Sequence, residues 1–371
     1  MLSGHLQQAR QKRQAAGLER KPRVPPAEGV DFSSNDYLGL RRDPGLKRVL
    51  EQAVRNSGCG SGSAHLVSGH SAAHARFEQA LAQWLGYEAC LLLPSGYQAN
   101  LALLSGLLPA GAPVLQDKLA HASLIDGARL GRLRLRRFRH NDVEHARRFI
   151  HRQRPWLLST EGVFSMDGDR APLMELAAIC RQADCWLHVD DAHGLGVLGP
   201  EGRGSVAAAG LNHSTVPLLT VTFGKAMGLS GAAVLAGREV IEHLHNHARP
   251  WIYSTATPPA WAEAGLHALE QIRGPERRRL LWRNIEQFRQ LAQAHELPLA
   301  SPAGPIQILP APDVATCSAW GRCLEAQGWR VGVIRPPTSP TPRLRITLTA
   351  AHRPEQIQGL VLALSRLRSR A

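Results

Sequence analysis

The chain has 371 residues, of which 44% are hydrophobic, so it is long enough for two domains, or for one large domain and a smaller one. Its longest apolar stretches fall well short of the ~20 residues that a membrane span needs, and residues 1–23 are polar and basic without the apolar core of a signal peptide. We therefore expect a cytoplasmic protein with no membrane segment.

The formal net charge of +14 leaves one alternative of a different class, a nucleic-acid-binding protein, because basic proteins gain affinity by neutralising phosphates. The arginines are nonetheless spread along the chain, and only residues 129–140 concentrate them. There Arg132, Arg134 and Arg136 alternate with leucines, as on an edge strand with one wet face. A solvated face is favoured over the alternative, binding of an anionic partner such as a phosphate-bearing thioester or an acidic carrier protein.

The cysteines contain no CxxC pair, so neither a disulfide framework nor a zinc knuckle is indicated. We expect them to be reduced and buried. The six are Cys59, Cys90, Cys180, Cys185, Cys317 and Cys323.

Helix and strand patterns alternate between residues 70 and 245. Helical spacing of apolar residues covers 71–86, where Ser71 is a plausible N-cap, and then 97–111, 121–131, 142–153 and 171–184. Short apolar runs predict strands within 88–94, 112–117, 132–138, 155–164, 185–193 and 216–224. Strands separated by helices need crossover connections, so we predict an α/β core with a mostly parallel sheet covered on both faces.

The chain changes character after residue 255. Residues 258–297 predict two amphipathic helices interrupted near Gly274 and Pro275, and strand-like pieces follow at 305–311, 329–337 and 342–351. This pattern predicts a smaller α+β domain. Ligands of open parallel sheets bind beyond the carboxyl ends of the strands, so the residues that follow the apolar runs are the candidate site residues.

Lys225 follows one of these apolar runs and precedes a turn rich in glycine. It is one of only five lysines in the chain, and Thr222 lies three residues before it. A solvated lysine that ends a strand is the structural alternative.

A second strand end carries acidic and imidazole groups. The apolar run 186–189 leads to Asp190 and then to His193 in a glycine-rich turn, and a buried acid there needs a cation opposite it. The cation could be a metal held by His188, Asp190 and His193, which would suit a metallohydrolase. A structural acid beside a capping histidine is the other alternative.

A third strand end offers an anion site. Ser95, Gly96 and Tyr97 join a strand to a helix, whose first backbone N–H groups can bind phosphate, although a plain connecting loop looks the same. An amine, a carboxylate and a phosphate cradle are together what pyridoxal 5'-phosphate requires. Arginine could not replace Lys225, because a guanidinium stays protonated and does not bond to the aldehyde.

These motifs resemble the α-oxoamine synthases, which are pyridoxal-phosphate-dependent transferases of fold type I. The matching stretches are residues 31–40, 58–87, 93–107, 117–130, 159–176, 188–204, 222–234, 253–260 and 341–352. The resemblance implies a large cofactor-binding domain with a mostly parallel sheet between helices, and a smaller α+β C-terminal domain. We place an N-terminal arm at residues 1–35, the large domain at 36–255 and the small domain at 256–371.

The resemblance also implies a role for each matching residue. Lys225 would bond to the cofactor aldehyde, Asp190 would bind the ring nitrogen, His193 would bind the ring hydroxyl and His121 would stack on the ring. The remaining cofactor-binding positions would be Gly96, Tyr97, Ser165 and Thr222. Besides His121, the substrate would meet Thr341 and Arg343 in the C-terminal stretch and an N-terminal arginine, here Arg20. No metal site is implied.

Four stretches are most similar to the family members that condense L-alanine with a pimeloyl thioester. They are residues 33–40, 164–169, 224–234 and 252–260. Relatives such as glycine C-acetyltransferase and 5-aminolevulinate synthase use the same chemistry on other substrate pairs and remain alternatives. The acyl carrier is left open between coenzyme A and acyl carrier protein. The resemblance further implies a homodimer, with Asn35 and residues 60–69 near the partner's cofactor.

Overall fold

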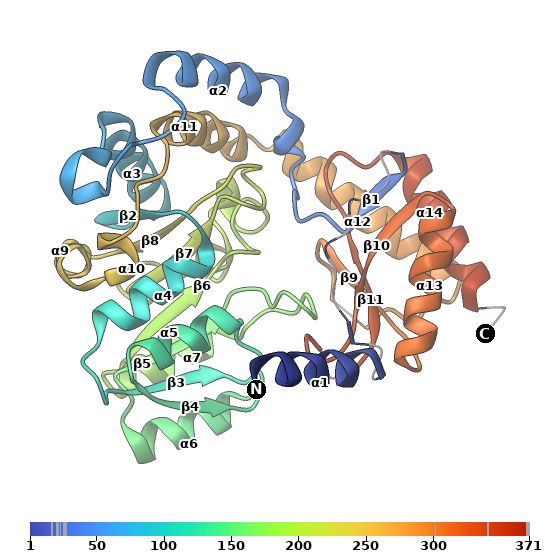
Figure 1. The fold of residues 1–371 in the computed structure, drawn as a ribbon, viewed down its shortest axis with the longest axis horizontal. Helices are drawn as coiled ribbons and strands as arrows, with labels where there is room; N and C mark the ends of the chain where they lie inside the picture. The colour runs from blue at the N-terminus through green and yellow to red at the C-terminus, as the bar shows by residue number, and fades with distance from the viewer. Residues whose placement is uncertain are drawn as a thin grey trace. The chain divides into compact units, whose positions relative to one another are not determined.

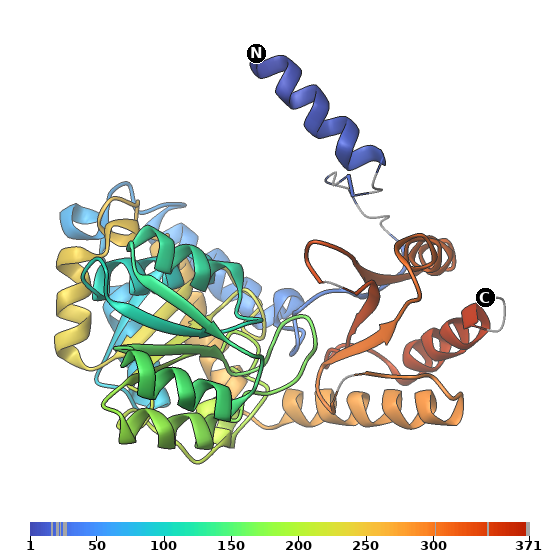
Figure 2. The ribbon, with the colours of Figure 1, turned by 90° about the horizontal axis from the view of Figure 1, so that it is seen from below.

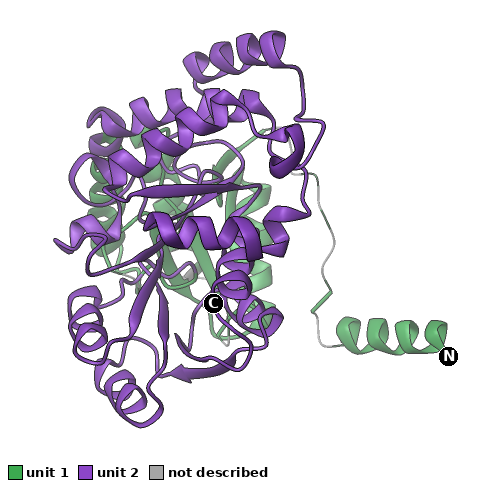
Figure 3. Ribbon diagram, turned by 90° about the vertical axis from the view of Figure 1, so that its left-hand side faces the viewer, with its two compact units in different colours: residues 1–34, 166–168, 280–371 green, residues 35–165, 169–279 purple. Residues whose placement is uncertain are grey.

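Two β-sheets, one of seven strands and one of four, organise the described part of the chain (Figure 1). The computed structural model describes residues 1–15, 18–19, 22, 24, 28–300, 302–339 and 341–368. Two compact units are present (Figure 3). Unit 1 comprises Met1–Ser34, Met166–Gly168 and Leu280–Ala371, and unit 2 comprises Asn35–Ser165 and Asp169–Arg279. The domain boundaries predicted after residues 35 and 255 stay predictions.

The seven-stranded sheet belongs to unit 2 and has the order β2-β8-β7-β6-β5-β3-β4. Its strands are β2 (Ala89–Leu93), β3 (Pro113–Asp117), β4 (Arg134–Phe138), β5 (Leu157–Glu161), β6 (Trp186–Asp190), β7 (Leu218–Thr222) and β8 (Ala232–Ala236). Only β8 runs against its neighbours, since it pairs antiparallel with both β2 and β7. The other six strands therefore point the same way and end at the same edge of the sheet.

Helices cover both faces of this sheet. Figure 2 shows α4 (Gly96–Leu107) and α5 (Ala122–Leu130) on one side, and α6 (Val143–Gln153) and α7 (Leu173–Gln182) on the other. The remaining helices of unit 2 are α2 (Pro44–Ser57), α3 (Ala72–Leu85), α8 (Ser205–Ala208), α9 (Arg238–His247), α10 (Arg249–Ile252) and α11 (Pro259–Arg273), with short turns η1 (Leu40–Arg42), η2 (His65–Gly69) and η3 (Pro200–Gly202).

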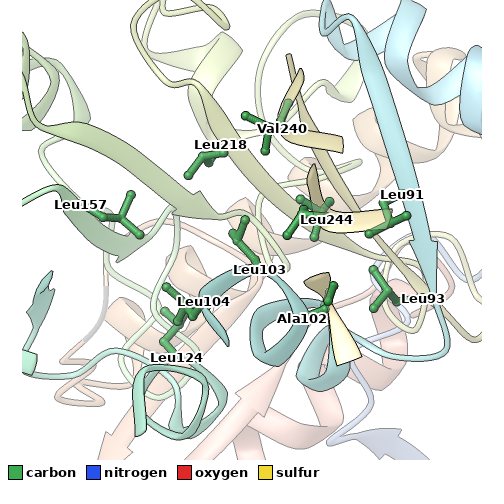
Figure 4. Close-up of a cluster of buried hydrophobic side chains, with 14 of the residues drawn as sticks. Leu91, Leu93, Ala102, Leu103, Leu104, Leu124, Leu157, Leu218, Val240 and Leu244 are labelled. Atoms are coloured by element: carbon green, nitrogen blue, oxygen red, sulfur yellow. The ribbon is translucent and has the colours of Figure 1, made fainter. Parts of the chain in front are cut away.

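The core of unit 2 lies between the sheet and helices α4, α5 and α9 (Figure 4). Leu91 and Leu93 of β2, Leu103 and Leu104 of α4 and Leu244 of α9 all belong to this cluster of buried side chains. All five side chains are fully buried, and each such burial contributes about 1.5–3 kcal/mol. This rigid layer fixes where the strand ends lie.

Unit 1 is built around the four-stranded sheet, with the order β1-β10-β11-β9. Its strands are β1 (Val30–Phe32), β9 (Ile306–Pro310), β10 (Trp329–Ile334) and β11 (Arg343–Thr347), and its helices are α1 (Leu2–Ala15), α13 (Val314–Ala326), α14 (Pro354–Arg368) and most of α12 (Glu276–Ala294). β1 is parallel to β10, and the other two pairs are antiparallel. None of the described helices has the length and apolar character that crossing a membrane requires.

The structure confirms the alternating pattern of the sequence. Ser71 caps α3, with its side chain and that of His74 forming a reciprocal capping box. β4 is an edge strand with exposed arginines, as the alternation at residues 132–138 predicts. The expected helix pair after residue 255 is present, and Gly274 ends α11.

The strand expected within 155–164 is present as Leu157–Glu161, whereas the small apolar residues 232–236 form an additional strand of this sheet that was not predicted. The cysteines are not all buried, because Cys59 is exposed and Cys323 is half-buried.

Candidate active site

The predicted cofactor residues of unit 2 converge at one edge of the seven-stranded sheet. β3, β5, β6 and β7 end there, and His121, Ser165, Asp190 and Lys225 lie at or just after these ends. β2 ends at the same edge and leads into the segment that begins α4. The parallel direction of the strands is what brings residues from five distant segments together.

Lys225 is held by a row of side-chain hydrogen bonds. Its Nζ lies 2.8 Å from Nε2 of His193, and the Tyr37 hydroxyl lies 2.5 Å from Nδ1 of the same ring. Tyr37 is fully buried and His193 is 4% exposed, so solvent does not compete for these contacts. The imidazole is therefore fixed between a phenol and an amine.

The loop that carries Lys225 is compact. Backbone hydrogen bonds close it, from the Phe223 N–H to the Gly231 carbonyl at 2.8 Å and from the Gly228 N–H to the Lys225 carbonyl at 2.9 Å. Gly228 has φ +66°, and a Cβ there would lie 2.3 Å from the backbone nitrogen of Arg41. Only glycine fits, so the glycine-rich turn is a packing requirement that holds the lysine in place.

Asp190 is oriented as a hydrogen-bond acceptor at the end of β6. Asn100 Nδ2 donates to its Oδ2 at 2.6 Å, and the Ala192 backbone N–H donates to its Oδ1 at 3.1 Å. The side chain is 6% exposed. The two donors fix the orientation of the carboxyl group at the end of the strand.

The adjacent Asp191 makes different hydrogen bonds, with Ser205. Its carboxylate accepts from the backbone N–H and the hydroxyl of Ser205, both at 2.6 Å, at the start of α8. Gly204 has φ +94°, and a Cβ there would lie 1.9 Å from Asp191 Oδ2. Burial raises the pKa of Asp191 to about 6. Of the two consecutive aspartates, only Asp190 faces the site residues.

A hydrogen-bonded chain connects Asp190 to His121. Besides Asp190, Asn100 Nδ2 donates to the Ser123 hydroxyl at 2.8 Å, and that hydroxyl lies 2.7 Å from His121 Nδ1. His121 also caps α5, since Nδ1 accepts from the Ser123 backbone N–H at 3.3 Å. The residue expected to stack on the cofactor ring is thus coupled to the residue expected to bind the ring nitrogen.

The start of α4 lies beside Thr222. Ser95 is the N-cap and accepts from the Gln98 N–H at 3.2 Å, while a Cβ at Gly96 would lie 3.5 Å from Thr222 Cβ. Tyr97 packs edge-on against His121 with ring centroids 6.3 Å apart, and its hydroxyl bonds to Asp126. A helix start beside a hydroxyl is a suitable phosphate site.

Glu161 is a second buried carboxyl at this edge of the sheet. It is paired across the β5–β6 ladder with Asp190 and is 3% exposed. Its Oε1 has no hydrogen-bond partner among the described residues. Burial raises the pKa of Glu161 well above its ordinary value, Asp190 raises it further, and Lys225 lowers it.

A charged cluster lies next to the loops that follow β3 and β5. His140 Nδ1 lies 2.9 Å from Asp117 Oδ1, and its Nε2 lies 2.7 Å from Asp169 Oδ2. Burial lowers the pKa of His140, but hydrogen bonds to the two carboxylates outweigh burial and raise it to about 10. The imidazolium therefore joins two segments, the one that leads from β3 to His121 and the one that follows Ser165.

The metal alternative is not favoured by the geometry. Both ring nitrogens of His188 are engaged by hydroxyls, Nδ1 by Ser159 at 2.6 Å and Nε2 by Thr220 at 2.9 Å. Within the described ranges, no group of three or more His, Cys, Asp and Glu side chains is arranged to hold a metal ion. His188 is a buried histidine that joins neighbouring strands.

Two of the predicted substrate residues do not belong to unit 2. Thr341 and Arg343 belong to unit 1, where the Arg343 guanidinium bonds to Asp167 and to the Thr341 hydroxyl. Arg20 lies outside the described residues. The roles of these three residues stay predictions.

The donor set fits pyridoxal phosphate. An amine, a carboxylate held in its acceptor geometry, a stackable imidazole, and a helix start with a nearby hydroxyl lie at one sheet edge. Sequence reasoning missed Tyr37, Asn100, Ser123 and Glu161. Glu161 ends β5 as Asp190 ends β6, but Ser159 and Thr160 separate it from the apolar residues of its strand.

Comparisons with known proteins agree with this fit. A family model described as aminotransferase class I and II matches residues 27–364. The 8-amino-7-oxononanoate synthase of Alkalilimnicola ehrlichii is 46% identical to this chain, and the match covers 99% of this chain and 98% of that protein. The protein of the same name from Halorhodospira halophila is 48% identical, with 90% of this chain and 84% of that protein covered.

Solved structures share the fold. A serine palmitoyltransferase from S. paucimobilis with bound PLP–myriocin has a TM-score of 0.91 and 27% identity, and the match covers 99% of this chain and 97% of that one. The 8-amino-7-oxononanoate synthase of Francisella tularensis has a TM-score of 0.81 and 30% identity, with 92% and 98% covered.

Proposed function

The chain belongs to the aminotransferase class I and II family, and from this premise we propose that it is a pyridoxal-phosphate-dependent acyltransferase. It condenses L-alanine with a pimeloyl thioester, releases carbon dioxide and the free thiol, and forms 8-amino-7-oxononanoate, a step of biotin biosynthesis. The reaction follows from relatives of that name at 46–48% identity that match 90% or more of the chain.

The observation that carries the proposal is the position of Lys225. Its amine, 2.8 Å from His193, lies at the same sheet edge as Asp190, as a cofactor held at its aldehyde and at its ring nitrogen requires. When bound, pyridoxal phosphate supplies an electron sink that stabilises negative charge at the amino acid Cα. Lys225 Nζ would hold the cofactor at its aldehyde and would be the base that accepts the proton from the alanine Cα.

The residues around Lys225 hold and orient the cofactor ring. Asp190, fixed by Asn100, keeps the ring nitrogen protonated, and His193 binds the ring hydroxyl while Tyr37 fixes its imidazole. His121 would cover the ring face. The hydrogen bond between its Nδ1 and the Ser123 hydroxyl would hold the imidazole in that orientation.

The phosphate is bound at the start of α4. Gly96 and Tyr97 supply backbone N–H groups, and Thr222 supplies a hydroxyl. Ser165 donates to the cofactor from the loop after β5. Rigid β-strands and helix starts carry these groups, so little ordering is needed when the cofactor binds.

Three residues are assigned to substrate carboxylates. Thr341, Arg343 and Arg20 orient alanine and the acyl chain by charge-assisted hydrogen bonds. Since Arg343 bonds to Asp167, a substrate carboxylate shares its guanidinium with that acid.

We infer further that the enzyme works in the cytoplasm as a homodimer. The resemblance to the α-oxoamine synthases supports the dimer, with Asn35 and residues 60–69 near the partner's cofactor. The acyl carrier is coenzyme A or acyl carrier protein, and the surplus of arginine suits either, because both are anionic.

Another α-oxoamine synthase activity is the second candidate, because a serine palmitoyltransferase shares the fold at a TM-score of 0.91. Mass spectrometry of the products separates the candidates. The enzyme is incubated with alanine and pimeloyl-CoA, and in parallel with glycine and either acetyl-CoA or succinyl-CoA. We expect 8-amino-7-oxononanoate from the first mixture only. A product from a glycine mixture, with none from alanine, would overturn the assignment.

A further inference from the structure

Four histidines of unit 2 form a connected group of rings, here called the histidine cluster. It consists of His65 in the short turn η2, His70 directly after it, His74 in α3 and His245 in α9. The His65 ring stacks on the indole of Trp251, with centroids 5.0 Å apart and planes 18° apart, and the His245 ring lies 4.8 Å from the same indole. The cluster therefore joins the turn to three helices, α3, α9 and α10.

His74 is held as a neutral imidazole by its hydrogen bonds. Its Nδ1 accepts from the Ser71 backbone N–H at 3.1 Å, so this nitrogen carries no proton. Its Nε2 lies 2.7 Å from the Thr257 carbonyl oxygen, which can only accept, so this nitrogen carries the one proton. A second proton on the ring would break the hydrogen bond to Ser71.

His65 and His70 meet through equivalent nitrogens. The two Nδ1 atoms lie 3.1 Å apart, so one must donate a hydrogen and the other must accept it. A proton added to the accepting nitrogen would leave two N–H groups and two cations facing each other. This arrangement therefore allows at most one charge on the pair.

The acidic groups near the cluster compensate little for added protons. Among the described residues, Glu78 of α3 is the acid within ion-pair distance of the cluster, with its Oε2 3.7 Å from His70 Nε2. Burial raises the pKa of Glu78 to about 7, so it is mostly neutral in mild acid. Burial and then His70 lower the pKa of His245, against the opposing effect of Glu242.

His65 anchors the turn η2. It is 7% exposed, whereas Leu66 and Val67 after it are 58% and 80% exposed. The backbone N–H groups of Val67 and Gly69 both donate to the Ala64 carbonyl, at 3.1 Å and 3.0 Å. Since His65 is the large buried side chain of this turn, its release would free the turn while leaving the sheet intact.

The direction of the pH effect follows from the burial of His65. Burial, and after it the neighbouring histidines, lowers the pKa of His65 to about 4, whereas a released histidine titrates near 6.5. Protons therefore favour the released turn. The closed turn has its full stability above about pH 6.5 and loses stability as the pH falls towards about 4.

We propose that the histidine cluster is a pH-sensitive switch, which holds η2 against α3 and α10 while His65 and His70 share one hydrogen bond and releases the turn when both rings become cationic. The inference goes beyond the proposed function and does not depend on it, because it concerns the opening of one segment of the fold.

Hydrogen–deuterium exchange followed by mass spectrometry measures this opening in the full-length protein. The protection of peptides that cover residues 64–69 is compared at about pH 7 and about pH 5, after correction for the intrinsic pH dependence of exchange. His65→Phe keeps a ring to stack on Trp251 but cannot titrate, and His65→Gln, which also cannot titrate, is made alongside it. The ratio of the protection at the two pH values separates titration from a loss of packing.

His243 provides the matched control. It belongs to α9 of the same unit and stacks on His247 with ring centroids 4.0 Å apart, but both rings are exposed. His243→Gln therefore removes one member of a histidine pair that solvent already reaches. Its pH response should equal that of the wild type.

In the wild type we expect protection of residues 64–69 to fall at least tenfold between about pH 7 and about pH 5, because the titration of His65 alone gives a roughly twentyfold change. Peptides of α4 should keep their protection. In both His65 variants the ratio should stay within about threefold of one. Constant protection in the wild type, an equal fall in the His65 variants, or an equal loss in α4 would overturn the inference.

Discussion

The amine of Lys225 lies 2.8 Å from Nε2 of His193, a residue at the end of the neighbouring parallel strand. The other nitrogen of this imidazole meets the hydroxyl of Tyr37, 156 residues earlier in the chain. The lysine is therefore not a solvated strand end, the alternative that its sequence context left open. It is the half-buried end of a row of hydrogen bonds whose other members, His193 and Tyr37, are buried.

Replacing Lys225 by alanine should abolish turnover and the visible absorbance of the lysine-bound cofactor, because Lys225 is the amine that the proposal assigns to the cofactor aldehyde. Absorbance spectroscopy of the purified protein and a product assay measure the two effects. Lys47→Ala, in the exposed part of α2, is the control and should behave as the wild type. Normal turnover by Lys225→Ala would refute the assignment.

Tyr37→Phe removes the hydroxyl that fixes His193 and keeps the ring volume. A net hydrogen bond contributes about 0.5–1.5 kcal/mol, and a buried partner left unsatisfied costs about 1–3 kcal/mol. We expect kcat/KM to fall about tenfold and the melting temperature to drop by a few degrees. Steady-state kinetics and thermal unfolding monitored by circular dichroism measure both. Unchanged kinetics would show that His193 is oriented by other contacts.

Asn100→Ala tests the chain from His121 to Asp190. Asn100 donates to Asp190 and to Ser123, and a hydrogen bond to a charged group is worth about 1.5–3 kcal/mol. Its loss should leave Asp190 less firmly oriented and weaken cofactor binding about tenfold or more, which a titration followed by the visible absorbance of the bound cofactor measures.

A double-mutant cycle with Ser123→Ala shows whether the chain acts as a unit. Because both variants interrupt the same chain, their effects on cofactor affinity should not add, with a coupling free energy above about 0.5 kcal/mol. Strict additivity would mean that His121 and Asp190 are positioned independently.

The ion pairs of His140 predict a pH dependence of stability. The folded pKa of about 10 lies above the usual value for histidine, so the stabilisation is complete below about pH 6.5 and is lost as the pH rises through about 10. His140→Gln should therefore lower the free energy of unfolding more at about pH 6 than at about pH 10. Urea denaturation at both pH values measures the difference. A constant difference would show that His140 is neutral in the folded protein.

Much of the fold could be predicted from local patterns. The apolar spacing that gives α3, the Ser71 cap and the break at Gly274 depend on residues a few positions apart. β8 could not be predicted in this way, because Ala232–Ala236 is a run of mostly small apolar residues with no period of its own. Its antiparallel direction is set by pairing with β2 and β7.

The candidate site's chemical groups could be predicted from the sequence: one lysine at a strand end, an aspartate and histidine at another, and a helix start after a third. The side chains that hydrogen-bond to these groups became known only from the folded structure. Tyr37 and Asn100 reach His193 and Asp190 from remote segments. The physical reason is that the neighbours of a residue at a strand end depend on which strands lie beside it. The order of strands in a sheet is set by packing over the whole chain and not by the local sequence.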